Sequence, residues 1–187
     1  MSKHYKRFLF SLLGVFILAG GLLLLRPYLE KDPTLDYKDT VFYYAWKYDL
    51  DPTLVLAVIK TESNFNPNAT SSANARGLMQ ITKDTLKWAL FREGEKADYS
   101  EEDLYDPEIN IRYGCLILSL LKEEFQDTDT ALAAYNAGRG NVIKWLKDSR
   151  FSKDGVIIAT PYRETNQYIK KVNKYHAQYQ KMLGDAK

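Results

Sequence analysis

A run of uncharged, mostly apolar residues near the start constrains this chain more than any other feature. It extends from Phe8 to Leu25 and follows the basic residues Lys3, Lys6 and Arg7. As a helix, these 18 residues would measure about 27 Å, close to the thickness of the hydrocarbon core of a bilayer. The run ends in four leucines, an arginine and a proline, without a small-residue cleavage site. The sequence therefore predicts a transmembrane signal anchor rather than a cleaved signal peptide.

The basic residues before the run also predict its orientation. Such residues stay on the cytoplasmic side, so we expect one span of the cell membrane, with the rest of the chain on the outer, cell-wall side. The predicted boundaries are a cytoplasmic tip and anchor at 1–25, a linker at 26–37 and one domain at 38–187. The stretch RPYLEKDPTLD reaches at most about 40 Å when extended, so the domain would work close to the membrane.

Composition excludes several classes of function. Hydrophobic residues make up 45% and charged residues 27%, as in a folded globular domain. From Glu30 onward the chain carries 22 basic and 24 acidic residues, which argues against a nucleic-acid partner. The single cysteine, Cys115, lies in an apolar helical run and is predicted to be a core residue. The only histidines, His4 and His176, show no metal-ligand spacing, so we expect no zinc site.

The domain at 38–187 is predicted to be mainly α. Asp51-Pro52 and Asp106-Pro107 each supply an N-cap followed by a proline of the first turn. Helices are predicted at 37–48, 52–62, 81–91, 107–125, 129–137, 140–148 and 161–183, with Gly138 as a helix stop. The segments 63–77 and 92–106 are predicted to be loops. No pair of alternating strands is evident, and a small hairpin within 92–105 stays open.

The helix predicted at 52–62 ends in an unexpected residue, Glu62. Val55, Val58 and Ile59 precede it by seven, four and three positions, so they share its face of the helix. The carboxyl would project into or beside the core at the negative end of the helix dipole, and both effects raise its pKa. This is the environment of a general acid that is protonated near neutral pH. From this pattern alone, a glutamate turned to solvent is an open alternative.

Four short stretches carry a family resemblance. They are ESNFNPNA from Glu62, ARGLMQIT from Ala75, AAYNAG from Ala133 and ETNQYIKKV from Glu164. In this order and spacing they resemble the lytic transglycosylases of the soluble-lytic-transglycosylase (SLT) type. The resemblance covers about residues 38–182 and implies a lysozyme-like helical catalytic domain, here preceded by one transmembrane helix.

The resemblance implies a role for each matching residue. Glu62 matches the single catalytic acid and base, and Ser63 the serine that positions substrate or the acid. Tyr135 and Asn136 match a pair near that carboxylate, Tyr168 a late tyrosine, and Glu164 a glutamate that supports a helix start. The strip that lines the sugar groove is matched by Gly77, Leu78, Met79 and Gln80.

Physical chemistry suggests how these residues would act. Gly77 lets the backbone approach a ligand closely, Met79 offers an apolar surface to a sugar, and Gln80 can bond an acetamido group or a hydroxyl. The Tyr135 hydroxyl is predicted to hydrogen-bond Glu62. Asn74 replaces a glycine common in the family, and asparagine tolerates positive φ best among the other residues.

The implied reaction cleaves the β-1,4 bond between N-acetylmuramic acid and N-acetylglucosamine in the glycan strands of peptidoglycan. Glu62 would protonate the glycosidic oxygen and then take the proton of the muramoyl C6 hydroxyl, leaving a 1,6-anhydro end. The resemblance implies that this reaction needs no metal and no cofactor. One alternative is a goose-type lysozyme-like hydrolase, which needs a second carboxylate; Asp84, Glu93 and Asp98 are the candidates. Another is an inactive, membrane-anchored glycan-binding protein. Protein partners are not indicated.

Overall fold

The computed structural model describes residues 34–184. The chain divides into a unit that ends at Leu35 and a second unit from Asp36 to Lys187. The predicted anchor at 8–25 lies outside the described residues, as does most of the predicted linker. Within residues 34–184, no helix combines the length and the apolar character that a membrane span requires.

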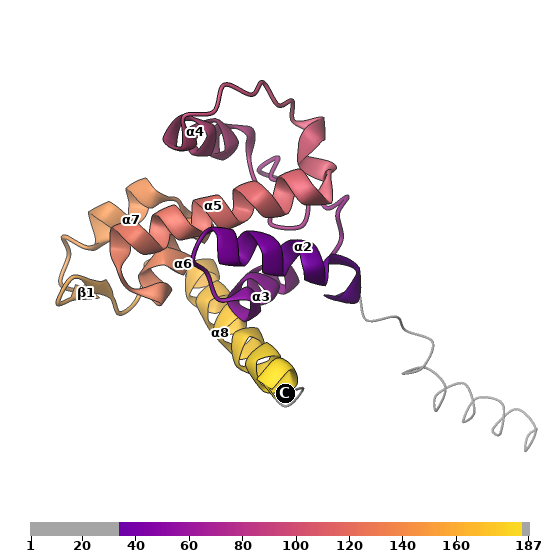
Figure 1. The fold of residues 1–187 in the computed structure, drawn as a ribbon. Helices are drawn as coiled ribbons and strands as arrows, with labels where there is room; N and C mark the ends of the chain where they lie inside the picture. The colour runs from indigo at the N-terminus through magenta and orange to yellow at the C-terminus, as the bar shows by residue number, and fades with distance from the viewer. Residues whose placement is uncertain (1–33, 185–187) are drawn as a thin grey trace, which may run out of the picture. The chain divides into compact units, whose positions relative to one another are not determined.

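The described part of the chain is mainly helical, as predicted (Figure 1). Its elements in chain order are α2 (Thr34–Lys47), α3 (Pro52–Glu62), α4 (Lys83–Glu93), the 3-10 helix η1 (Glu102–Tyr105), α5 (Pro107–Phe125), α6 (Thr128–Ala137), α7 (Arg139–Trp145), β1 (Ser152–Lys153), β2 (Val156–Ile157) and α8 (Arg163–Gly184).

The helix boundaries follow the capping residues. Asp51 accepts a hydrogen bond from the backbone N–H of Thr53 at the start of α3, and Asp106 accepts from Glu108 and Ile109 at the start of α5. In both helices a proline occupies the first turn, where its missing N–H costs nothing. Gly138 ends α6 at φ 88°, which a residue with a side chain rarely adopts. These three predicted boundaries are confirmed.

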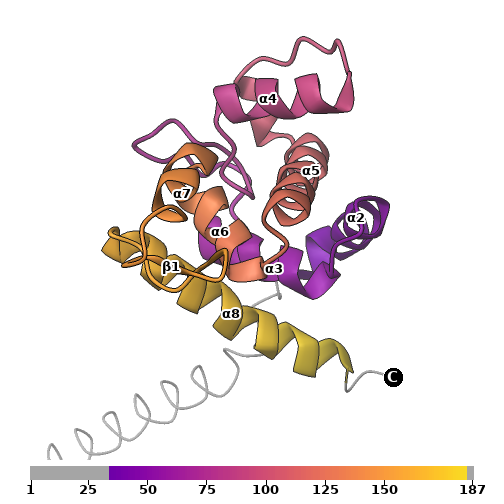
Figure 2. The same ribbon diagram turned by 90° about the vertical axis from the view of Figure 1, so that its left-hand side faces the viewer.

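Helix α3 lies at the centre of the core. Every residue from Thr53 to Ile59 is buried, which is what a helix that is apolar on all sides requires. It packs most extensively against α8, which runs along one side of it in both views (Figures 1 and 2), while α5 packs against α6. Cys115 on α5 is buried as predicted, and burial raises the pKa of its thiol.

The hairpin is in a different place from the one left open by the sequence. The structure places η1, not strands, within 92–105, and pairs β1 with β2 in antiparallel register, Ser152 opposite Ile157. Asp154 and Gly155 form the two-residue turn with φ of 51° and 81°. An Asp-Gly pair is the strongest short-range hairpin signal, so the expectation of no strand pair is wrong, although the sequence carried the information.

Candidate active site

A cavity of about 410 Å³ opens at the C-terminal end of α3. Its walls come from α3, the segment 71–82, and helices α4, α5, α6 and α8. Among the residues predicted for the site, it is lined by Glu62, Gln80, Tyr135, Asn136 and Glu164. Residues that are far apart in the sequence therefore meet around Glu62.

The Glu62 carboxyl has an unusually high pKa, as its position predicted. The residue keeps part of its surface open to the cavity, but the surrounding protein removes most of the water from its carboxyl. This desolvation is the main cause that raises the pKa from 4.5 to about 7. The negative charge of Glu164, which lines the same cavity, adds to the increase, whereas Tyr168 opposes it. A carboxyl with this pKa is half protonated near neutral pH and can both give and take a proton.

Tyr168 lies beside this carboxyl. Its hydroxyl is buried and forms no well-aligned hydrogen bond with any residue in 34–184, yet its interaction with Glu62 lowers the pKa of the carboxyl. Burial and the charge of Glu62 raise the pKa of Tyr168 well above its ordinary value, so the hydroxyl stays protonated. A neutral donor next to Glu62 favours the ionised form of that carboxyl.

The chain turns sharply just after Glu62. Ser63 caps α3, and the next two residues, Asn64 and Phe65, have φ of 52° and 63°. A phenylalanine at positive φ is an outlier that costs free energy. The Phe65 side chain is only 4% exposed, so core packing holds the turn in place. The turn directs the chain away from the helix and leaves Glu62 at the cavity.

The strip from Gly77 to Gln80 is less exposed to the cavity than predicted. Leu78 and Met79 are completely buried, so the expectation that they offer surface to a sugar is wrong. Instead, the backbone of the strip accepts and donates hydrogen bonds inside the protein. The Ser63 hydroxyl donates to the Leu78 carbonyl at 2.8 Å. Ser63 thus connects the end of α3 to the strip and does not line the cavity.

The prediction for the Tyr135 hydroxyl is also wrong. It donates to the Met79 carbonyl at 2.8 Å and not to Glu62. Tyr135 and Glu62 line the same cavity. Burial and, after it, the charge of Glu62 raise the pKa of Tyr135 well above its ordinary value. Tyr135 therefore connects α6 to the strip in the same way that Ser63 connects α3 to it.

Asn110 is a structural residue of the site that the sequence reasoning missed. It is completely buried in α5. Its Oδ1 accepts from the Met79 N–H at 2.7 Å, and its Nδ2 donates to the carbonyls of Arg76 and Leu104 at 2.8 and 2.7 Å. Its signal was a polar side chain on an otherwise apolar helix face, which must find partners when buried.

Gly77 packs against this asparagine rather than against a ligand. A Cβ at Gly77 would lie 2.2 Å from Asn110 Nδ2 and 2.2 Å from the Leu104 carbonyl oxygen, and the residue has φ 75°. The absence of a side chain at Gly77 therefore makes room for the buried Asn110 side chain, where the sequence predicted close approach of a ligand. Asn74 has φ 58°, as expected for a residue in a glycine position.

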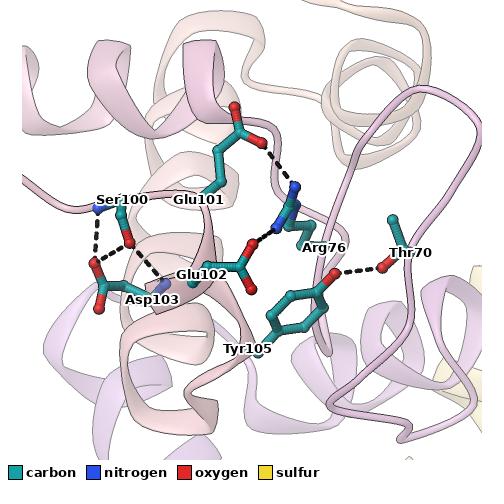
Figure 3. Close-up of polar contacts among 7 residues, drawn as sticks. All are labelled: Thr70, Arg76, Ser100, Glu101, Glu102, Asp103 and Tyr105. Carbon is teal, nitrogen blue, oxygen red and sulfur yellow. Dashed lines mark hydrogen bonds and ion pairs between the residues drawn. The ribbon is translucent and has the colours of Figure 1, made fainter.

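A second network holds the segment 69–81 from outside (Figure 3). Arg76 pairs with Glu102 and, at 2.7 Å, with Glu101, and its guanidinium lies 5.3 Å from the centre of the Tyr105 ring. The Tyr105 and Thr70 hydroxyls share a hydrogen bond of 2.6 Å. This network fixes both ends of the loop 71–75, of which Ser71, Ser72, Ala73 and Ala75 line the cavity.

Two amides complete the lining. Gln80 donates from Nε2 to the carbonyls of Ala69 and Gly77 at 3.1 and 2.9 Å, which leaves its oxygen for a ligand. Asn136 accepts at Oδ1 from the Thr165 hydroxyl at 2.8 Å, which leaves its Nδ2 as a donor. One acceptor and one donor at fixed positions suit a neutral polar ligand such as an acetamido sugar.

The three acids that the sequence offered for a hydrolase, Asp84, Glu93 and Asp98, do not line this cavity. Asp84 lines a neighbouring one, Glu93 accepts from the Tyr48 hydroxyl at 2.9 Å, and Asp98 is exposed in the loop after α4. Within residues 34–184, no group of three potential metal ligands is found. His176 instead contacts Asp51 at 2.8 Å, joining α8 to α3.

A helical domain with a largely desolvated carboxyl at the end of its central helix, facing a polar cavity, has the arrangement of a general acid. Residues 39–158 match the family described as Transglycosylase SLT domain. The chain belongs to this family, which is of the lysozyme-like superfamily.

Similar proteins support the assignment. The chain is 37% identical over 136 residues to a putative soluble lytic murein transglycosylase of Haemophilus influenzae, covering 71% of this chain and 23% of that protein. It is 33% identical over 165 residues to the membrane-bound lytic murein transglycosylase C of Actinobacillus pleuropneumoniae, covering 76% and 45%.

Two solved structures share the fold. An inactive glutamate-to-glutamine mutant of the lytic transglycosylase Slt of Pseudomonas aeruginosa superposes with a TM-score of 0.70 at 34% identity, covering 79% of this chain and 24% of that one. The 70 kDa soluble lytic transglycosylase of Escherichia coli gives 0.71 at 31% identity, with the same coverage. The chain thus spans between 23% and 45% of the length of these relatives.

Proposed function

We propose that the chain is a peptidoglycan lytic transglycosylase. The observation that carries the proposal is the Glu62 carboxyl, whose pKa of about 7 suits a group that must give a proton and then take one. Family membership supplies the class of substrate, the glycan strands of peptidoglycan. The neutral polar lining at Gln80 and Asn136 is consistent with sugars that bear acetamido groups.

In the proposed reaction, protonated Glu62 donates to the glycosidic oxygen between N-acetylmuramic acid and N-acetylglucosamine, and the bond from C1 to that oxygen breaks. Ionised Glu62 then takes the proton of the muramoyl C6 hydroxyl, and the C6 oxygen bonds to C1. The product ends in a 1,6-anhydromuramoyl residue, Glu62 regains its proton, and no water is consumed.

The supporting residues act at different distances from the reaction. Gln80 and Asn136 would hold substrate, and Tyr168 would stabilise the ionised form of Glu62 between the two proton transfers. Ser63 and Tyr135 are positioning residues, because both hydrogen-bond the backbone of the buried strip. Gly77, Leu78 and Met79 form that strip and do not contact substrate.

Hydrolysis is the second candidate, and one observation favours it. Glu164 lines the same cavity as Glu62 and acts on its pKa, so a second carboxylate is present. Sequence reasoning assigned Glu164 only to a helix start. If it activated water on the far face of the sugar, the product would carry a reducing end.

Mass spectrometry of muropeptides released by the purified chain tests the proposal. We expect 1,6-anhydro ends from the wild type, the same ends from Glu164→Gln, and no release by Glu62→Gln with glycan binding retained. Reducing ends that disappear in Glu164→Gln would establish the hydrolase. Binding without release by the wild type would identify an inactive glycan-binding protein.

We also propose that residues 8–25 anchor the domain at the outer face of the cell membrane, because the run is uncharged and follows three basic residues. A phosphatase reporter after Lys187 should then be active outside the membrane, and the chain should resist salt and alkaline extraction. Release of a shortened soluble form as the main product would contradict the anchor.

A further inference from the structure

Helix α8 carries a straight row of cations on its solvent-exposed face. The row consists of Arg163, Lys170, Lys174 and Lys181, and all four residues are exposed. They are seven, four and seven positions apart, and such spacings keep residues on one face of a helix. At 1.5 Å per residue the row is about 27 Å long. Because α8 lies along one edge of the domain, this face is open to a partner (Figure 2).

The acids near α8 are bound on a different face of the helix. Asn173 donates to Asp129 Oδ1 at 2.8 Å, and His176 contacts Asp51 Oδ2 at 2.8 Å. These two α8 residues lie roughly 80° to 140° around the helix from the cationic row. Glu164, the one acid of α8, lines the active-site cavity. The cations of the row form no ion pair and no hydrogen bond within residues 34–184.

The charge of the domain is divided between α8 and the remainder. Helix α8 contains five basic residues and one acid, a net charge of +4. The residues from Thr34 to Tyr162 contain 15 basic and 20 acidic side chains, a net charge of −5. An anionic surface would therefore attract α8 and repel the rest of the domain, which would turn the row toward that surface.

The dimensions of the row indicate the kind of partner. Cations spread over about 27 Å match an extended array of negative charges better than one small anion. The proposed anchor supplies such an array nearby, because residues 26–33 reach at most about 29 Å when extended. At the surface of a membrane, anionic lipid headgroups attract basic segments, and each Lys or Arg contributes to the attraction.

We propose that α8 binds the outer surface of the cell membrane through this row, with anionic lipid headgroups as the partner. The first turn of α8 carries both Arg163 of the row and Glu164 of the cavity, so binding would hold the cavity beside the membrane surface. The enzyme would then act on the glycan strands nearest the membrane. The proposal takes the nearness of a bilayer from the proposed anchor, whereas the row itself is independent of the transglycosylase reaction.

Lysine footprinting of the full chain in nanodiscs tests the proposal. The nanodiscs contain phosphatidylcholine alone or with added phosphatidylglycerol, and a water-soluble reagent acetylates accessible amines, which mass spectrometry then locates. We expect acetylation of Lys170, Lys174 and Lys181 to slow when phosphatidylglycerol is present and to recover at high salt. Lys87 and Lys153, which are exposed outside α8, should react equally in both lipids.

A matched pair of double variants assigns the effect to the row. Lys170→Gln with Lys174→Gln should lower the ratio of bound to free domain about 25-fold, about 5-fold for each charge, measured as lost protection of Lys181. Lys87→Gln with Lys153→Gln should leave that protection unchanged. All four substituted residues are exposed, so both variants should keep the unfolding temperature of the wild type.

Several outcomes would overturn the proposal. Equal protection of the row in both lipids, or protection in neither, would exclude binding by anionic headgroups. Protection by added poly(glycerol phosphate) but not by phosphatidylglycerol would assign the row to a soluble wall polymer. If the chain does not enter nanodiscs, the anchor fails, and cosedimentation with phosphatidylglycerol vesicles decides the role of the row. Muropeptide release is measured separately, so a failure of the proposed function leaves this test valid.

Discussion

The two sides of the candidate active site are built in different ways. On one side, α3 delivers Glu62 from a helix whose residues are buried all round and which packs against α8. On the other side, the segment 69–81 has little regular structure and is held by side chains that bond its backbone, above all Asn110, Ser63 and Tyr135. Hydrophobic packing places the reactive group, and specific hydrogen bonds shape the wall that faces it.

This difference predicts which substitutions the protein tolerates. A helix packed by many dispersed apolar contacts loses stability in proportion to the atoms removed. A loop held by a few buried polar groups fails when one partner is removed or displaced, because the remaining groups are left without a hydrogen bond. The effect of a substitution in the segment 69–81, or in the side chains that bond it, should therefore depend on whether a single hydrogen-bonding atom is lost or displaced.

The largest effect is expected for Gly77→Ala. The new Cβ would overlap Asn110 Nδ2 and the Leu104 carbonyl, each 2.2 Å away, at a φ of 75° that already disfavours a side chain. We expect a loss of roughly 3 kcal/mol or more in the free energy of unfolding, measured by urea denaturation. Gly94→Ala is the control, since Gly94 has φ 72° but no atom of the described residues would lie within 4 Å of the added Cβ. Similar losses for both would mean that backbone strain, not the Asn110 contact, matters.

Glu62→Gln should reveal the cost of the buried carboxyl through pH. Its pKa is raised in the folded state, so the folded protein binds the proton more tightly, and stability falls as pH rises from 4.5 to about 7. Glu62→Gln has no carboxyl that ionises at this position, so its stability does not fall for this reason as pH rises. At pH 8 the free energy of unfolding of Glu62→Gln should exceed that of the wild type by less than about 3 kcal/mol, because the carboxyl is partly hydrated, and the variant should unfold at a higher temperature. At pH 4 the two proteins should be equally stable. A variant less stable than the wild type at pH 8 would make Glu62 a structural residue.

Substitutions of two tyrosines near Glu62 should distinguish a role in stability from a role in the reaction. Tyr135→Phe leaves the Met79 carbonyl without its partner and should cost about 1–3 kcal/mol of unfolding free energy. Tyr168→Phe removes a hydroxyl with no well-aligned bond, so its effect on stability should be smaller. It also removes an influence that lowers the Glu62 pKa, so the upper limit of the pH–rate profile should move to higher pH. If Tyr168→Phe lost more stability and Tyr135→Phe shifted the pH–rate profile, Tyr168 would be the structural residue and Tyr135 the one that acts on Glu62.

The smallest effect on stability is expected for Arg76→Gln. The Arg76 side chain is only 15% exposed, but its partners Glu101 and Glu102 are open to solvent, and ion pairs with exposed acids contribute little. Because the pairs hold the cavity loop at 71–75, turnover should fall more than the unfolding temperature, and high salt should reproduce part of the loss in the wild type. A variant that loses stability but keeps its turnover would show that the pairs do not position the loop.

The sequence predicted the helical side of the site far better than the loop side. The Asp-Pro pairs and the apolar spacing before Glu62 are local signals, so the helix, its end and the raised pKa could be predicted. The partners of Tyr135 and the burial of Met79 depend on contacts with α5 and on side-chain direction, which no local pattern encodes. Asn110 and the Asp154-Gly155 turn did leave signals, a polar residue on an apolar face and a hairpin dipeptide.

The proposed mechanism depends on one property, a Glu62 carboxyl that is half protonated near neutral pH. An NMR titration of the chain labelled with 13C at the glutamate carboxyls measures this directly, with Glu62→Gln identifying the signal. The account predicts a midpoint of about 7 and a transglycosylase rate that falls as pH rises through the same range. A midpoint near the ordinary value of 4.5, with activity unchanged above pH 8, would contradict it.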